Sequence, residues 1–233
     1  NIISLLCPTK NRSNKFKRMC ESLLSHTDNF NRLELLLCFD EKELEIDYYN
    51  DIIRSLTKKG VKVLIFFEKL NSHAKRNNYL AKKSSGNIIF PINDDLIFTT
   101  LQWDKILDFE FSKNEIEKPL CIWINCDRKY KFLDFSAFPV INRSWYDTLG
   151  YIVPEIFIFW YLDWWICDVS RKSDRYFLSE ITIKQFHANK YLDEIDTTHK
   201  LNSTKKNLDH DKNKWLKKNS LRIKDSLLIK SKF

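Results

Sequence analysis

The sequence predicts a three-layer α/β/α fold with a mostly parallel central sheet, followed by a basic helical C-terminal extension. Short apolar runs of strand length alternate with segments of helical periodicity over the first 98 residues. These runs are almost continuously apolar, which is typical of strands that helices cover on both faces. At 233 residues and 43% hydrophobic content the chain can bury a sizeable core. No apolar run reaches the ~18 residues that a membrane span requires.

The first half of the chain is predicted to alternate four strands with three helices. Apolar side chains recur at i, i+3, i+4 and i+7 in two of the helical segments, which places them on one helical face. Gly60 and Gly86 stand where the second and third helices end. The strands are expected at 2–7, 33–39, 61–67 and 87–92, and the helices at 13–24, 49–56 and 72–85.

The second half carries a weaker pattern. We expect a helix near Trp103, a strand over 120–125, an aromatic-rich segment over 156–170 and a strand over 176–186. The predicted organisation is one domain over residues 1–199 and an extension over residues 200–233. The domain would divide into a first half (1–98) and a second half (99–199).

The excess positive charge lies in the extension. Residues 1–199 hold 28 Lys and Arg against 28 Asp and Glu, whereas residues 200–233 hold 11 against 3. A neutral body argues against a nucleic-acid groove across the main domain. The extension has Leu216, Ile223 and Leu227 near one helical face, and two interpretations stay open. In the first, the extension is an amphipathic helix that lies on an anionic membrane. In the second, the helix packs on the main domain and its lysines remain in solvent.

The glycine and cysteine patterns exclude several classes of site. With only three glycines, neither G-x-G-x-x-G nor a P-loop can be written. The six cysteines form no C-x-x-C pair, and we interpret them as small core residues in a reducing cytoplasm; a metal site at Cys121 and Cys126 is the less favoured alternative. We therefore expect a cytoplasmic protein, with the extension as its candidate contact with the cytoplasmic face of the membrane.

Polar side chains follow three of the predicted strands. The loop 8–12, Asp40 and the triplet 93–95 all come where a strand ends, so a parallel sheet gathers them along the edge where such folds bind ligands. The pair Asp94 and Asp95 has two interpretations: it caps the next helix, or it holds a hard divalent cation such as Mg or Mn.

Asp163 interrupts the most apolar segment of the chain. It is either the N-cap of a helix that begins at Trp164 or a partly desolvated general base. Asp168 lies roughly 140° further round a helix at ~100° per residue, so only one of the two acids can face a given pocket. His187, after the last predicted strand, is either a metal ligand or the first polar residue of a loop.

Four segments carry a resemblance to a known family. They are ISLLCPTKNRSNKFKRMCESLL (3–24), LLLCFDE (35–41), NSHAKRNNYLAKKSSGNIIFPINDDLIF (71–98) and PEIFIFWYLDWWICDVSRKSDR (154–175). In order and spacing they resemble the P-T-x-N-R loop, base-binding acid, A-x-R-N helix, D-x-D strand end and acceptor segment of the Rossmann-like GT-A glycosyltransferases, in particular inverting family 2. Asn93 departs from D-x-D, and Leu162 stands where the family has the Glu of a Glu-Asp pair.

The resemblance implies that residues 1–98 form the nucleotide-sugar-binding half of the domain and residues 99–199 the acceptor half. It also implies a role for each matching residue. Asp163 would be the catalytic base, and Asp95 and His187 would bind a divalent metal, Mn or Mg. Asp94 would contact the ribose or the water shell of the metal. The remaining donor-binding residues would be Pro8, Thr9, Asn11, Arg12, Asp40, Arg76, Asn77 and Asn93.

The implied activity is transfer of a sugar from a nucleotide-sugar donor, UDP being the first choice of nucleotide, to a hydroxyl of a glycan or lipid-linked acceptor. The configuration at the anomeric carbon would invert. A second hypothesis is a non-catalytic or nucleic-acid-binding α/β module that uses the basic extension. Salt-dependent binding to RNA or DNA would support that second hypothesis.

Overall fold

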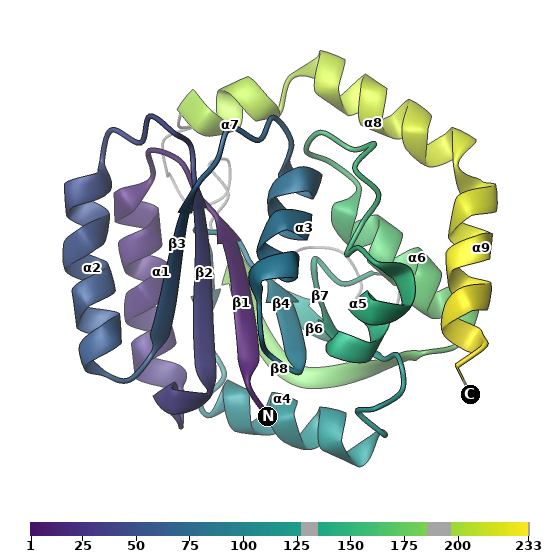
Figure 1. Ribbon diagram of the computed structural model, residues 1–233, viewed down its shortest axis with the longest axis horizontal. Coiled ribbons are helices and arrows are strands. Elements are labelled where there is room, and N and C mark those ends of the chain that lie inside the picture. The colour runs from purple at the N-terminus through teal and green to yellow at the C-terminus, as the bar shows by residue number, and fades with distance from the viewer. Residues whose placement is uncertain (127–134, 186–196, 233) are drawn as a thin grey trace.

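The computed structural model describes residues 1–126, 135–185 and 197–232 (Figure 1). Within them the strands are β1 (Ile3–Pro8), β2 (Leu33–Phe39), β3 (Lys62–Phe67), β4 (Ile88–Pro91), β5 (Leu96–Phe98), β6 (Cys121–Cys126), β7 (Phe138–Asn142) and β8 (Tyr176–Gln185). The helices are α1 (Ser13–His26), α2 (Ile46–Lys58), α3 (His73–Lys83), α4 (Trp103–Lys113), α5 (Arg143–Leu149), α6 (Leu162–Ser173), α7 (Thr197–Asn202), α8 (Lys205–Lys217) and α9 (Asn219–Lys230). A short 3₁₀ turn, η1 (Phe30–Arg32), precedes β2.

One sheet contains all the described strands, in the order β3-β2-β1-β4-β7-β6-β8-β5. The first four strands in this order pair in parallel, as the sequence predicts, and the register sets Leu5 of β1 between Leu35 and Phe90. β7 is antiparallel to β4 and β6, and β5 is antiparallel to β8. β6 and β8 are parallel. The sheet is thus parallel in its N-terminal half and mixed beyond it.

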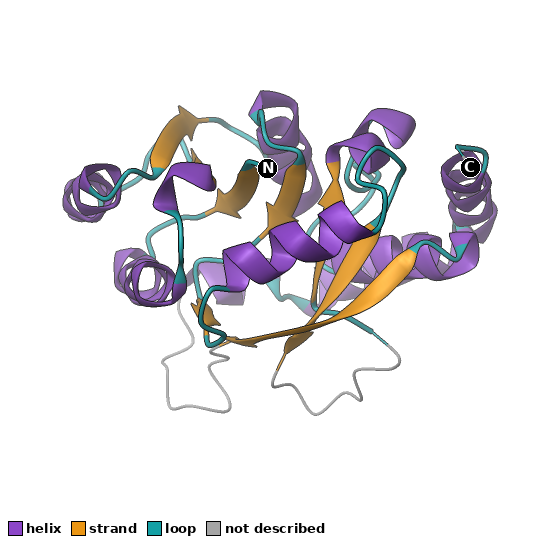
Figure 2. Ribbon diagram, turned by 90° about the horizontal axis from the view of Figure 1, so that it is seen from below, coloured by secondary structure: helices purple, strands orange, loops and turns teal. Residues whose placement is uncertain are grey.

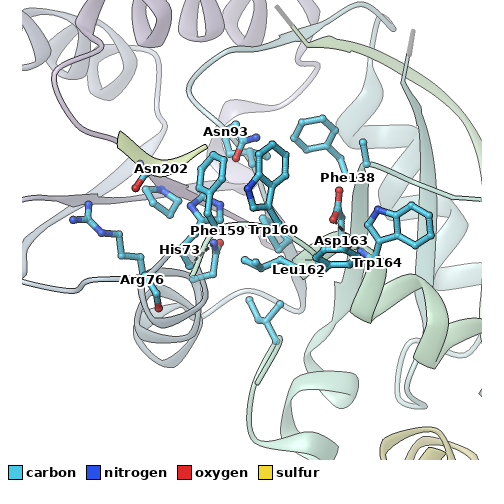
Figure 3. A pocket seen from close by; sticks show the side chains of 18 of the residues that line it. His73, Arg76, Asn93, Phe138, Phe159, Trp160, Leu162, Asp163, Trp164 and Asn202 are labelled. Atoms are coloured by element: carbon cyan, nitrogen blue, oxygen red, sulfur yellow. Dashed lines mark hydrogen bonds between the residues drawn. The ribbon is translucent and has the colours of Figure 1, made fainter. Parts of the chain in front are cut away.

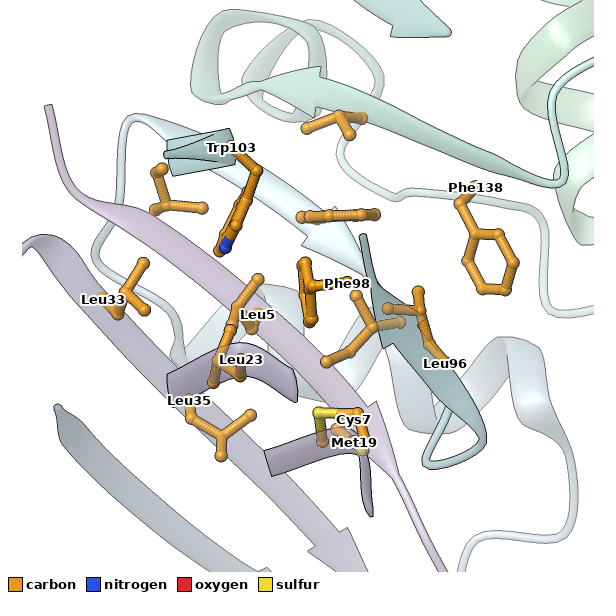
Figure 4. Close-up of a cluster of buried hydrophobic side chains, with 14 of the residues drawn as sticks. Leu5, Cys7, Met19, Leu23, Leu33, Leu35, Leu96, Phe98, Trp103 and Phe138 are labelled. Carbon is orange, nitrogen blue, oxygen red and sulfur yellow. The ribbon is translucent and has the colours of Figure 1, made fainter. Parts of the chain in front are cut away.

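Helices cover both faces of the sheet (Figures 1 and 2). Alternate strand residues enter two separate cores. Leu5 packs with residues of α1, α2 and α4 (Figure 4), whereas Leu6 packs with residues of α3, α5, α6 and α9. Five of the six cysteines are buried, which confirms the interpretation of those five as core residues.

The paired acids lie in a turn between two strands. The amide of Leu96 donates to the carbonyl of Asn93 at 3.2 Å, and the chain enters β5 at once. The sequence pattern does not predict β5 as a separate strand. The next helix, α4, begins at Trp103 with Gln102 as its N-cap. Asp94 and Asp95 therefore do not cap a helix, and that interpretation is wrong.

The extension folds as three helices, and α9 packs against α6 and α5. The side of α9 that faces the body buries Arg222, Asp225, Ser226 and Ile229. Leu216, Ile223 and Leu227, which the sequence places near one face, are all exposed. No helix within the described ranges is long and apolar enough to cross a membrane.

A buried acid joins the strands at the end of the sheet opposite the loop 8–12. Glu34 accepts hydrogen bonds from the Ser4 hydroxyl at 2.7 Å, the Ser85 amide at 2.8 Å and Lys62 at 2.9 Å. Burial acts to raise the pKa of Glu34, but these hydrogen bonds outweigh it and the pKa is lowered from its ordinary value. Glu34 thus links β2 to β1, β3 and the turn before β4.

Replacing this acid should destabilise the fold. We expect Glu34→Ala to lower the free energy of unfolding by about 2–4 kcal/mol, because it leaves buried donors unpaired. Urea denaturation followed by circular dichroism measures the change. The control is Glu21→Ala, whose side chain is exposed, and equal stability of the two variants would contradict the expectation.

Candidate active site

A cavity of about 1180 Å³ opens where β1, β2 and β4 end (Figure 3). Its wall continues across the α5–α6 connection to the C-terminal helices. Of the residues predicted from the sequence, it is lined by Pro8, Thr9, Arg12, Asp40, Arg76, Asn77, Asn93, Asp94, Asp95 and Asp163. The strand order therefore brings the loop 8–12, Asp40 and the triplet 93–95 to one edge, as predicted, and Asp163 of α6 lines the same cavity.

Arg12 is the cationic partner of the paired acids. Its guanidinium lies 2.5 Å from Asp94 Oδ1 and 3.6 Å from Asp95 Oδ2. Asp94 is only 1% exposed and also accepts a hydrogen bond from the Thr9 hydroxyl at 2.7 Å. The backbone amide of Arg12 donates to the Tyr49 hydroxyl, which in turn contacts Thr9. The loop after β1 is thereby fixed against the β4–β5 turn.

Asp95 supplies the oxygen chemistry that a hard cation prefers. Its Oδ1 accepts a hydrogen bond from the side-chain nitrogen of Gln185 at 3.2 Å. Asp94 and Asp95 both border the cavity. Mg and Mn use one or two protein carboxylates and take other oxygens from a substrate diphosphate, so Asp95 fits such an ion. Among the residues that the structure describes, no group of three or more His, Cys, Asp or Glu side chains could hold a metal without such a substrate.

Asp40 sits between two cations. It accepts hydrogen bonds from Lys10 at 2.9 Å and from Arg76 at 3.1 Å. The bond from Lys10, followed by the charges of Lys10 and Arg76, lowers the pKa of Asp40 against the opposing effect of burial. Asp40 is therefore ionised, and it holds Arg76 at the edge of the cavity.

One predicted residue within the described ranges, Asn11, does not line the cavity. Asn11 adopts a left-handed backbone with φ of 49°, and its side-chain oxygen accepts from the amide of Leu44. Its amide oxygen is thus engaged with the loop before α2. His187 lies outside the described residues, so its assignment as a metal ligand stays a prediction.

Asn77 lines the cavity, and its side-chain nitrogen donates to the carbonyl of His73 at 3.0 Å. Its side-chain oxygen is buried and has no hydrogen-bond partner. A buried acceptor of this kind carries a desolvation cost unless a ligand or water satisfies it.

Asp163 is the second residue of α6, which begins at Leu162. Tyr161 is the N-cap residue, with φ of 68°, so Asp163 is not the helix cap. Its carboxylate accepts from the amide of Trp164 and lines the cavity, whereas Asp168 points to Lys172 and Arg222. This arrangement agrees with the prediction that only one of these two acids faces the pocket.

Aromatic rings surround Asp163. Trp160, Tyr161 and Trp164 line the same wall, and Trp215 of α8 stacks on Tyr161 with ring centroids 5.5 Å apart. The Trp side chains here are therefore shared between the core and the cavity. Such a wall suits the apolar face of a sugar ring.

Sequence reasoning missed two parts of the site. His73 appears solvent-facing from the sequence, but it lines the cavity and its ring contacts Phe159 at 6.0 Å between centroids. The C-terminal helices also line the cavity, through Thr198, Leu201, Asn202, Leu208, Lys212, Trp215 and Leu216. Only the Ser72 cap of α3 could have indicated that His73 begins a helix that points at the strand ends.

The sequence matches no protein-family model and no curated protein. Its structure, however, is similar to solved glycosyltransferases. The S. aureus TarS fragment 1–349 superposes with a TM-score of 0.63 at 12% identity, covering 79% of this chain and 60% of that one. A mannosyltransferase of Pyrobaculum calidifontis, in complex with GDP-Man and Mn²⁺, gives 0.61 at 10% identity, covering 78% and 56%.

GalNAc-T7, solved with UDP, GalNAc and Mn²⁺, gives a TM-score of 0.64 at 14% identity, covering 80% of this chain and 43% of that one. The chain thus spans about 60% or less of these structures. At this level of identity the likeness defines the fold. The protein has the GT-A fold of glycosyltransferases, as the sequence motifs predict.

His73 should make stability depend on pH. Burial, with the charges of Arg76 and Arg12, lowers its pKa from 6.5 to about 4. Between these values the unfolded chain binds a proton that the folded chain rejects, so stability falls as pH drops from 7 to 5. We expect the fall in the free energy of unfolding between pH 7 and pH 5 to be about 1–2 kcal/mol smaller in His73→Gln than in the wild type. Urea denaturation at both pH values measures this fall, and His26→Gln is the control. An equal fall in the wild type and in His73→Gln would contradict the expectation.

Proposed function

We propose that this protein is a glycosyltransferase that moves a sugar from a nucleoside diphosphate donor, UDP being the first choice, to a hydroxyl of a glycan or lipid-linked acceptor. The observation that carries the proposal is the single cavity at the strand ends. It combines Asp40, Asp94 and Asp95, the cations Lys10, Arg12 and Arg76, and the separate acid Asp163. The GT-A fold of the chain supports it.

The donor would occupy the side of the cavity formed by β1, β2 and α3. Arg76 is held by Asp40 at the cavity edge, where a guanidinium suits a phosphate or a base carbonyl. The unpartnered oxygen of Asn77 suits a hydroxyl donor of a ribose or sugar. Asp95 would hold a divalent cation that, when bound, neutralises charge on the departing nucleoside diphosphate.

The acceptor would approach from the aromatic wall. Asp163 would take the proton of the acceptor hydroxyl as its oxygen attacks the anomeric carbon. The bond between that carbon and the diphosphate oxygen breaks, and the nucleoside diphosphate leaves with the bonding electrons. A single displacement of this kind inverts the configuration at the anomeric carbon.

Removing the base should abolish transfer but leave donor binding intact. We expect Asp163→Asn to lower kcat by about 10²–10⁴-fold. Nucleotide release from a panel of UDP sugars with Mn²⁺ measures turnover, and thermal shift measures donor binding. The control is Asp174→Asn at the exposed end of α6, where the left-handed backbone accepts Asn. Equal turnover of the wild type and Asp163→Asn would contradict the assignment.

Asp95 should connect nucleotide binding to the metal. In the wild type we expect Mn²⁺ to increase the thermal stabilisation that UDP produces. In Asp95→Ala the increment from Mn²⁺ should vanish while any stabilisation by UDP alone remains. An unchanged increment in Asp95→Ala would place the metal elsewhere.

We propose in addition that α9 contacts an anionic membrane surface. Its body-facing side is buried, whereas Ile223, Leu227 and Leu228 are exposed together with Lys224 and Lys230. The excess of lysine in residues 200–233 complements anionic lipid head groups, and exposed aliphatic side chains can enter the interface. A lipid-linked acceptor would then lie in the same membrane surface that α9 contacts.

Vesicle sedimentation tests this contact. We expect binding to vesicles of phosphatidylglycerol and phosphatidylcholine, little binding to phosphatidylcholine alone, and a several-fold loss in Leu227→Glu. The control is Leu44→Glu, because Leu44 is 82% exposed on the connection between β2 and α2. Equal binding by both variants, or salt-dependent binding to RNA in place of vesicles, would contradict the proposal.

A further inference from the structure

Asp211 is a buried acid of α8 that binds a loop near the cavity. It is 0% exposed, and it accepts hydrogen bonds from the backbone amides of Ile158, Phe159 and Trp160 at 2.9, 2.9 and 2.8 Å. His210 Nδ1 lies 2.9 Å from the same carboxylate. Three backbone donors on one carboxylate form a strong, charge-assisted cluster. Helix α8 therefore holds this loop at three consecutive residues.

The same loop is held from the donor side of the cavity. The amide of His73, the first residue of α3, donates to the carbonyl of Ile158 at 2.7 Å. Asn78 of α3 binds the carbonyl of Val153 at 2.8 Å and the amide of Ile152 at 3.0 Å. The α5–α6 connection contains neither helix nor strand over these residues, yet it is fixed between α3 and α8.

The side chain of Trp160 faces the cavity from this fixed segment. Figure 3 shows it among the side chains that line the cavity, which include Asn93 and Asp163. Its indole Nε1 is buried and has no hydrogen-bond partner. A buried donor without a partner is unfavourable, and a ligand oxygen would reach this one once the indole ring rotates toward the cavity. The side-chain oxygen of Asn77, an unpaired acceptor, lines the same cavity.

We infer that Trp160 donates its indole N–H to an oxygen of the bound nucleotide sugar or acceptor, and that Asp211 is the positioning residue that holds Trp160 in place. The inference rests on the proposed function for the identity of the ligand. The fixed backbone and the unpaired donor are both features of the free chain. Trp160 would thereby recognise an oxygen-rich ligand between the strand-end acids and Asp163.

Replacing Trp160 by Phe removes the N–H and keeps an aromatic ring. We expect Trp160→Phe to lower kcat/KM for the nucleotide sugar about 10-fold or more, since a hydrogen bond to a charged oxygen contributes about 1.5–3 kcal/mol. The matched control is Trp145→Phe. The Nε1 of Trp145 is likewise buried and unpaired, but Trp145 belongs to the core and does not line the cavity.

Asp211→Asn tests the positioning role, because it replaces the carboxylate that accepts three backbone hydrogen bonds by a neutral amide with a single acceptor oxygen. We expect Asp211→Asn to lower kcat/KM to a similar degree, and Asp209→Asn, at an exposed acid of the same helix, to have no effect. The indole N–H signals of ¹⁵N-Trp-labelled protein provide a readout of position. Trp160→Phe assigns the Trp160 signal, which should shift in Asp211→Asn without ligand and in the wild type on adding UDP-N-acetylglucosamine.

The outcomes separate the two proposals. If no UDP sugar binds or is turned over by the wild type, the proposed function fails, while a shift of the Trp160 signal in Asp211→Asn still supports the positioning role. If a UDP sugar is turned over but Trp160→Phe matches the wild type and the Trp160 signal does not move on binding, the inference is overturned. Equal effects of Trp145→Phe and Trp160→Phe would also overturn it.

Discussion

The ion pair between Arg12 and Asp94 is the interaction on which the half of the cavity at the strand ends depends. Asp94 is nearly inaccessible to water and adjoins a second carboxylate, so without a cation its ionised form would cost several kcal/mol. Arg12 supplies that cation, and the Thr9 hydroxyl supplies a further hydrogen bond. The loop after β1 and the turn after β4 are thereby fixed to each other, so the cavity has its shape before a ligand enters.

Most of this half could be predicted from the sequence because it requires only strand boundaries and a parallel order. Once β1, β2 and β4 are recognised, their ends must meet, and with them Arg12, Asp40 and Asp95. Side-chain direction cannot be predicted this way. Asn11 belongs to the same loop as Arg12, but its left-handed backbone directs its amide oxygen to the loop before α2. Likewise, no local pattern distinguishes a metal from Arg12 as the partner of Asp94.

The C-terminal helices show what a charge count cannot reveal. Residues 200–233 contain three acids, and two of them, Asp211 and Asp225, are buried in contacts with the body. Asp225 accepts hydrogen bonds from the Tyr151 hydroxyl and the Trp165 indole, and Arg222 binds Asp168. These partners lie 50 or more residues earlier in the chain, so no helical periodicity could indicate them. The outer surface of the extension is consequently richer in lysine than its composition suggests.

These contacts also determine where Asp163 lies. Asp163 follows the loop that α3 and α8 fix, and α6 begins only after the left-handed residue Tyr161. Leu162, the neighbour of Asp163, lines the cavity as an apolar side chain. Asp163 is therefore the one carboxylate that α6 contributes to the described cavity wall. The loop before Asp163 is held by hydrogen bonds to Asp211 and His73. Neither residue belongs to the strand-end segments from which the site was predicted, so the sequence could not indicate how far Asp163 lies from Asp94 and Asp95.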